Sequence, residues 1–181
     1  MSSNGMRMKV VNALKSSESN QPAFLPEPQN DILVLGIGNL LMKDEGVGIH
    51  VARRLEKENL PGTDLMDGGT GGLHLLDHIQ RHKKVIIIDA SLDEYPAGTV
   101  RVLHPKFTRD FPRQLSAHEI GFKDLIDAAV ITGNLPEMHL VAISVKDFNE
   151  MGMELSAEAE AAIPEAMARV LELVLTRGPT G

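Results

Sequence analysis

Cysteine is absent from the 181 residues, which excludes disulfide bonds, thiolate metal sites and a cysteine nucleophile. Apolar runs long enough to span a membrane are also missing, because every apolar run has only the length of a strand. The chain has no excess of basic residues. Its formal net charge is −7, so we expect no binding to nucleic acid or to a membrane surface. A cysteine-free chain of this kind fits a reducing setting, and we expect a cytoplasmic protein.

The length suits one domain with its own hydrophobic core. Residues 1–30 are rich in Ser, Asn, Gln and Pro, and they lack the apolar core of a secretory signal. We expect this segment to be a mobile leader. Residues 31–178 are then expected to form the single folded domain.

The segment 32–48 is the one around which we expect the other elements to be arranged. It reads ILVLGIGNLLMKDEGVG, with four apolar residues typical of a buried strand, a glycine-rich turn, two acids and a helix start. A dinucleotide-binding turn would need a third glycine where this chain has Leu41. Asp44 and Glu45 would also repel a pyrophosphate, so the loop suits a cation better. Alternatively, Asp44 caps the helix and Glu45 complements its dipole.

Hydrophobic patterns predict strands that alternate with helices along the chain. The expected strands are residues 32–35, 63–66, 84–89, 99–104 and 138–145. The expected helices are residues 45–59, 73–81, 119–132 and 156–176. In the second helix we expect Leu73, Leu76 and Ile79 to face inward, and Ser156 is expected to cap the last helix. The alternation predicts a three-layer α/β/α sandwich with a mostly parallel sheet of about five strands, including one antiparallel edge strand.

Three polar residues are expected at the carboxyl edge of this sheet. Glu45 follows the first strand, and Asp89 ends the third. His118 would lie in the first turn of a helix that starts with a capping box of Ser116 and Glu119. Two carboxylates and an imidazole suit borderline divalent metals such as nickel, zinc or manganese, and three ligands leave positions open for water or substrate. The alternative is that all three residues have only structural roles.

Asp67 is a further candidate, because it ends a strand immediately before the turn GGTGG. Its carboxylate could act as a general base or orient the backbone of a substrate. It could equally cap the next helix or accept hydrogen bonds from amides of its own turn.

Other polar residues suit a site less well. His74, His78 and His82 recur every four residues, as metal ligands on a helix do, but the solvated face of that helix is the favoured interpretation. Ser91 and Ser116 lack the G-x-S-x-G turn, which disfavours a serine hydrolase.

Four segments together resemble the maturation endopeptidases of nickel–iron hydrogenases. They are GIGNLLMKDEGVG from Gly36, DGGTGG from Asp67, IDA from Ile88 and SAHEIG from Ser116. They occur in the family's order and at similar spacing, and the likeness covers residues 31–175. Each motif alone is weak, whereas four in register are specific.

The resemblance implies a phosphorylase/hydrolase-like fold and a cytoplasmic peptidase that trims the C-terminal extension of the hydrogenase large subunit after nickel loading. Carried onto matching positions, it implies Glu45, Asp89 and His118 as metal ligands and Asp67 as another functional residue. The metal would be nickel carried by the substrate precursor, and cadmium or zinc could substitute in crystals. The family is grouped with aspartic-type endopeptidases, although the mixed ligand set fits a metal better than two aspartates sharing a proton.

We therefore expect Glu45, Asp89 and His118 to bind nickel already held by the large-subunit precursor, so that recognition of the substrate and binding of its metal are one event. The expected active form is a monomer. The alternative function is a non-catalytic nickel-binding maturation chaperone that uses the same three ligands. Residue 117 is Ala where many family members have Pro, which loosens the turn before His118 but leaves that ligand in place.

Overall fold

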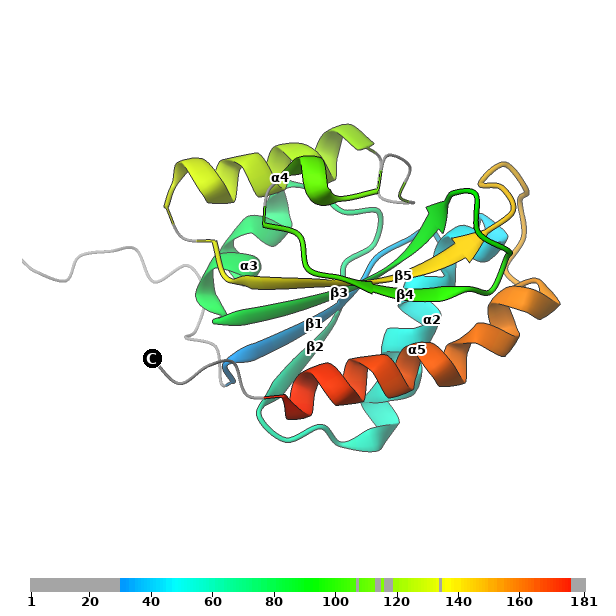
Figure 1. Ribbon diagram of the computed structural model, residues 1–181, viewed down its shortest axis with the longest axis horizontal. Helices are drawn as coiled ribbons and strands as arrows, with labels where there is room; N and C mark the ends of the chain where they lie inside the picture. The colour runs from blue at the N-terminus through cyan, green and yellow to red at the C-terminus, as the bar shows by residue number, and fades with distance from the viewer. Residues whose placement is uncertain (1–29, 107, 113–114, 116–118, 134, 177–181) are drawn as a thin grey trace, which may run out of the picture.

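The computed structural model describes residues 30–106, 108–112, 115, 119–133 and 135–176. They contain one five-stranded sheet in the order β2-β1-β3-β5-β4 (Figure 1). The strands are β1 (Ile32–Gly36), β2 (Thr63–Asp67), β3 (Lys84–Leu92), β4 (Val100–Leu103) and β5 (Glu137–Val145). Four strands run parallel, and β4 pairs antiparallel with β5 at one edge. The predicted sheet, with its antiparallel edge strand, is confirmed.

Helices cover both faces of this sheet (Figure 1). One face carries α3 (Leu76–Arg81) and α4 (Glu119–Ile131), and the other carries α2 (Val47–Leu55) and α5 (Ala157–Leu175). Short 3-10 helices are η1 (Lys43–Gly46), η2 (Glu56–Glu58), η3 (Leu73–Leu75) and η4 (Thr108–Asp110). The three layers are those of the predicted α/β/α sandwich. None of the helices described is long and apolar enough to cross a membrane.

Each face of the sheet has its own apolar core, because side chains alternate along every strand. In the central strand β3, Val85 and Ile87 pack with Leu125 of α4 on what we call the α4 face. Ile86 and Ile88 pack on the opposite side, the α5 face, with residues of α2 and α5. All these side chains are fully buried. A continuous β-branched run therefore suits a strand that is covered on both sides.

The strand order reverses between β1 and β3. From β1 the chain passes through α2 to β2 on one side, and from β2 it passes through α3 to β3 on the other side of β1. In open α/β sheets, ligands bind beyond the carboxyl ends of the strands at such a switch point. Gly36, the last residue of β1, is level with Ile88 of β3. The residues that follow Gly36 and Ile88 therefore border this switch point.

The third strand is longer than predicted. We expected it to end on Asp89, but β3 continues to Leu92 because β5 pairs with it as far as the Leu92–Val145 position. Asp89 consequently stands beyond the end of β1 while it is still held inside the sheet by its pairing with Ala142.

The second helix differs from its prediction in which side chains face inward. The chain enters it from Gly72, whose φ is +149°, through the 3-10 turn η3. This entry turns Leu75 into the core and leaves Leu73 61% exposed, whereas we expected Leu73 to be buried. Ile79 is buried as expected, and Leu76 is partly buried.

Two other predictions concern residues outside those described. The leader 1–30 falls there except for Asn30, and so does the turn 116–118 with its proposed capping box. These stay predictions.

Candidate functional site

Glu45 lies in η1, where the chain folds back immediately after β1. Gly38 permits this fold, since its φ is +147° and a Cβ there would lie 2.0 Å from the carbonyl oxygen of Glu45. Gly48 permits α2 to start against the sheet, because a Cβ there would lie 2.2 Å from the carbonyl oxygen of Ile88. A larger residue at Gly38 would displace η1, and a larger residue at Gly48 would force α2 away from the sheet. Glu45 is thus held beside the switch point with 7% of its surface exposed.

Asp89 lies one residue beyond the level at which β1 ends. Its neighbour Ile88 accepts a 2.9 Å hydrogen bond from the N–H of Ile37, the first residue after β1. The alternation along β3 places Asp89 on the α4 face, and the residue is 1% exposed. Both Asp89 and Glu45 take part in polar or electrostatic interactions. Burying a carboxylate is costly unless it is paired or binds a cation, so two of them beside one switch point mark this place as a candidate site.

The third predicted ligand, His118, lies outside the described residues, immediately before α4. That helix covers the face of the sheet on which Asp89 lies. Glu45 and Asp89 come from separate segments, η1 and β3, and these two segments pack against each other. Within the described part of the chain, no group of three His, Asp or Glu side chains is placed to hold a metal ion. The complete ligand set therefore stays a prediction.

Asp44 does not cap its own helix, contrary to the structural alternative considered for it. Neither η1 nor α2 has a side-chain cap. Instead, Asp44 accepts two 2.7 Å hydrogen bonds from Ser156, one from the backbone N–H and one from the hydroxyl. Ser156 caps α5 as predicted, because its hydroxyl oxygen accepts a 3.2 Å hydrogen bond from the N–H of Ala159. The segment that carries Glu45 is therefore anchored to the start of the last helix.

A second attachment joins the same segment to the loop after β5. The N–H of Lys43 donates to the carbonyl oxygen of Gly152 at 2.8 Å, and the N–H of Gly152 donates to that of Leu41 at 2.9 Å. Lys43 also forms an ion pair with Glu150. These contacts hold the approach to Glu45 in one conformation.

Asp67 ends β2 and is exposed at the same edge of the sheet. One carboxylate oxygen accepts a 3.0 Å hydrogen bond from the N–H of Gly69, as its turn-forming alternative predicts. The other forms a 3.1 Å ion pair with Arg53 of α2. Asp67 thus has a structural role in its own turn, and its exposure leaves it accessible to a bound polypeptide.

Contrary to our prediction, the histidine stripe on the second helix is not wholly solvated. His74 is exposed, but His82 is buried with 6% exposure. Its Nδ1 lies 2.6 Å from the carbonyl oxygen of His78, and its Nε2 lies 3.0 Å from a carboxylate oxygen of Asp64. Burial raises the pKa of Asp64, but hydrogen bonds from His82 and Asn30 outweigh this and lower it. His82 is therefore a structural histidine that pairs with β2.

A polar cluster beyond the end of β3 was not identified from the sequence. Asp93 forms an ion pair with Arg101, whose guanidinium lies 4.2 Å from the centre of the Tyr95 ring. Burial raises the pKa of Asp93, but the hydroxyls of Ser144 and Ser91, the N–H of Tyr95 and the charge of Arg101 outweigh this and lower it. No short motif marks this cluster, because its members come from three separate segments.

This cluster borders a hollow of about 550 Å³. Leu92 and Asp93 line it from the end of β3, Leu103 from β4, and Phe111 and Pro112 from the loop after β4. Leu92 is three residues past Asp89, so about 10 Å of extended strand separates the hollow from the predicted metal site. The hollow is thus within reach of a polypeptide bound at Asp89.

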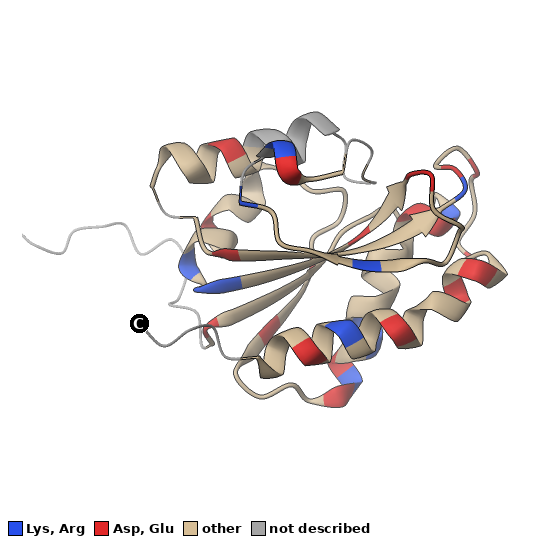
Figure 2. Ribbon diagram, in the orientation of Figure 1, with Lys and Arg blue, Asp and Glu red and all other residues tan. Residues whose placement is uncertain are grey.

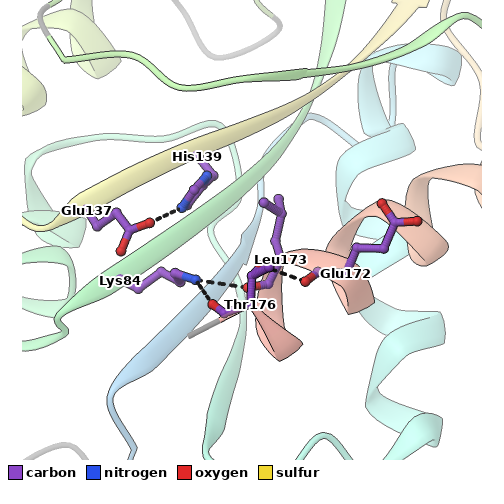
Figure 3. A network of polar contacts seen from close by, with 6 residues as sticks. All are labelled: Lys84, Glu137, His139, Glu172, Leu173 and Thr176. Atoms are coloured by element: carbon purple, nitrogen blue, oxygen red, sulfur yellow. Dashed lines mark hydrogen bonds and ion pairs between the residues drawn. The ribbon is translucent and has the colours of Figure 1, made fainter. Parts of the chain in front are cut away.

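A second polar network lies at the opposite end of the sheet, close to the end of α5 (Figure 3). Lys84 is buried, and its ammonium group donates to the carbonyl oxygens of Leu173 at 2.9 Å and Thr176 at 2.6 Å. His139 is buried nearby, with Nε2 2.7 Å from a carboxylate oxygen of Glu137. Burial lowers the pKa of His139, and the ion pair with Glu137 only partly offsets this. This network supports α5 and is remote from the switch point.

Comparison of the sequence with known proteins points to one family. The sequence model of the family described as hydrogenase maturation proteases matches residues 49–173. The chain is 33% identical over 160 residues to the hydrogenase expression/formation protein HupD of Rhizobium leguminosarum bv. viciae, covering 84% of this chain and 78% of that protein. It is 32% identical over 151 residues to the hydrogenase 2 maturation protease of Escherichia coli K12, covering 81% of this chain and 92% of that protein.

Comparison of the fold with solved structures points to the same family. The solved structure of the hydrogenase maturating endopeptidase HybD from Escherichia coli matches with a TM-score of 0.72 and 31% identity, covering 79% of this chain and 91% of that one. Sequence and structure therefore agree over most of the folded part. The chain belongs to the hydrogenase maturation protease family, whose members are endopeptidases.

Proposed function

We propose that this chain is the endopeptidase that removes the C-terminal extension of a nickel-loaded hydrogenase large-subunit precursor. Membership of the family supports the reaction class. The observation that supports metal recognition is the burial of two carboxylates, Glu45 and Asp89, from separate segments beside one switch point. In this proposal Glu45, Asp89 and His118 recognise nickel that the precursor already carries, so nickel is part of the substrate.

The chemistry of the ligand set fits this role. In this proposal one divalent cation binds both buried carboxylates and offsets the repulsion between their charges. An imidazole from His118 would add the nitrogen ligand that nickel accepts readily. Three ligands from this chain leave positions for the precursor's own ligands, so the two proteins can share the ion. A precursor without nickel would lack this contact and would bind weakly.

The remaining residues of the edge supply contacts to the polypeptide. Asp67 is exposed there, and its carboxylate could accept a backbone N–H of the bound extension or take a proton as a general base. The hollow beside Asp93 offers space for a substrate side chain, three residues further along β3 than Asp89 and beyond the end of that strand. We further propose that the enzyme acts as a monomer in the cytoplasm, where the large subunit would receive its nickel.

The test is to mix the chain with nickel-loaded and with nickel-free precursor and to measure the intact masses of the products. We expect the nickel-loaded precursor alone to lose the mass of its C-terminal extension. Equal cleavage of both precursors would contradict recognition of nickel. Binding without any change in mass would contradict protease activity and favour the chaperone alternative.

A further inference from the structure

Three large apolar side chains are exposed on the loops beside η1. Leu41 is 61% exposed, Met151 is 80% exposed and Met153 is 68% exposed. We call these three residues the apolar patch. Large apolar side chains that lie together on the surface of a protein commonly mark an interaction site. Methionine is well suited to this use, because its unbranched side chain adapts to the shape of a partner.

The backbone fixes the members of the apolar patch beside one another. Gly152, which separates the two methionines, donates its N–H to the carbonyl oxygen of Leu41 and accepts a hydrogen bond from the N–H of Lys43. Gly152 and Met42 also form a parallel β-bridge. The apolar patch is therefore assembled from two loops that the fold holds together. Its residues are exposed although their backbone is fixed, unlike the residues of a loose chain end.

The apolar patch adjoins the predicted metal site. Leu41 lies four residues before Glu45, and the N–H of Glu45 donates to the carbonyl oxygen of Met42 at 3.0 Å. Asp44, between them, is anchored to Ser156. A polypeptide whose nickel is bound at Glu45 would therefore lie against the apolar patch.

The surroundings of the apolar patch are acidic. Asp147, Glu150 and Glu154 flank the two methionines, and the nearby cations Lys43 and Lys146 are paired with Glu150 and Glu158. Figure 2 colours the acidic and basic parts of the chain. An anionic membrane surface would be repelled by these carboxylates. Two copies of this chain would oppose like charges if their patches met around a two-fold axis. An apolar segment flanked by basic residues would be complementary.

We infer that the apolar patch binds an apolar segment of the large-subunit precursor, flanked by basic residues, and thereby holds the precursor while its nickel occupies the site. This inference rests on the proposed function, because the precursor is the polypeptide whose metal would be bound beside Leu41. The contact is made equally in the ground state and the transition state, since the patch lies outside the reacting groups. Its loss should therefore weaken binding without slowing the chemical step.

The test compares a double variant, Met151→Ser with Met153→Ser, with the control Ile131→Ser. Ile131 is 84% exposed at the end of α4, at the opposite edge of the sheet, so the control removes a similar apolar surface elsewhere. With nickel-loaded precursor we expect the KM of the double variant to rise about tenfold at unchanged kcat, and the control to match the wild type within about twofold. An unchanged KM in the double variant would overturn the inference.

A second measurement needs no substitution. Mild peroxide oxidises exposed methionines, and we expect bound nickel-loaded precursor to slow the oxidation of Met151 and Met153 several-fold. Equal oxidation with and without bound precursor would overturn the inference. Concentration-dependent dimerisation of the wild type that the double variant abolishes would also overturn it, because a second copy would then be the occupant. If the wild type binds the precursor but does not cleave it, the proposed function fails, while protection of the methionines still supports docking.

Discussion

Asp44 and Ser156 are 112 positions apart in the sequence, and two hydrogen bonds of 2.7 Å join them. Through this pair the segment that carries Glu45 and the first turn of α5 are fixed to one another. Asp44 is 8% exposed, so its carboxylate is buried and fully engaged by the backbone N–H and hydroxyl of Ser156. The residue before the predicted metal ligand therefore anchors that ligand's loop.

Replacing Asp44 with Ala should lower the free energy of unfolding by about 2 to 3 kcal/mol, because Ser156 then loses a charged acceptor and the cap of α5 loosens. Urea denaturation measures the change. Asp31→Ala is the matched control, since its exposed carboxylate pairs with Lys83 at the surface and should matter by less than about 0.5 kcal/mol. Equal effects of the two substitutions would contradict an anchoring role for Asp44.

Asp67→Asn separates a structural from a functional role at the end of β2. The amide keeps an oxygen that can accept the hydrogen bond from Gly69, so we expect little change in stability. Cleavage of the nickel-loaded precursor should fall by 10²-fold or more, on the order of the contribution of a general base. Arg53→Met removes the same ion pair from the other side and should leave cleavage nearly unchanged. Equal losses in both variants would mean that Asp67 acts only through Arg53.

Lys84→Met should lower the free energy of unfolding by about 2 kcal/mol. The methionine retains the buried stem but leaves the carbonyl oxygens of Leu173 and Thr176 without their charged donor (Figure 3). Thermal unfolding followed by circular dichroism measures the loss. Lys83→Met is the control, because the Lys83 side chain is 79% exposed and forms a surface ion pair with Asp31. A loss no greater than that of the control would show that the capping of α5 by Lys84 contributes nothing.

The buried His139 should make stability depend on pH. Burial lowers its pKa, the nearby charges of His104 and Lys84 lower it further, and Glu137 partly offsets this. A depressed folded-state pKa stabilises the fold above the unfolded value of about 6.5, and this stability is lost as the pH falls through the folded-state value. Urea denaturation between pH 8 and pH 5 should therefore give a flatter stability profile for His139→Leu than for the wild type. Parallel profiles would assign the acid sensitivity to other groups.

The sheet was predictable because its signals are local. The four consecutive β-branched residues Val85–Ile88 are typical of a central strand. The glycine-rich turn after the first strand places Glu45 directly beyond that strand. The position at which a strand ends depends on residues distant in the sequence. Leu92 belongs to β3 because β5 pairs with it. Leu73 was misplaced because Gly72 introduces a 3-10 turn that shifts the helical register.

The candidate site was predictable only in part, since its supporting contacts are long-range. The order of the motifs indicated Glu45 and Asp89, and both are buried beside the switch point. The partner of Asp44 could not be found in this way, because nothing near Asp44 in the sequence points to Ser156. The cluster around Asp93 was missed for a similar reason, since Arg101 of β4 and Ser144 of β5 reach it from separate strands.

The most direct test of the central claim is the intact mass of nickel-loaded precursor after incubation with Glu45→Gln, Asp89→Asn or His118→Ala, each first shown by circular dichroism to be folded. The two amide variants preserve side-chain shape while removing charge, so they test metal recognition and not packing. We predict that the precursor keeps its full mass with every variant, whereas the wild type removes the C-terminal extension. Removal of the extension by any folded variant at the wild-type rate would contradict a site made of these three residues.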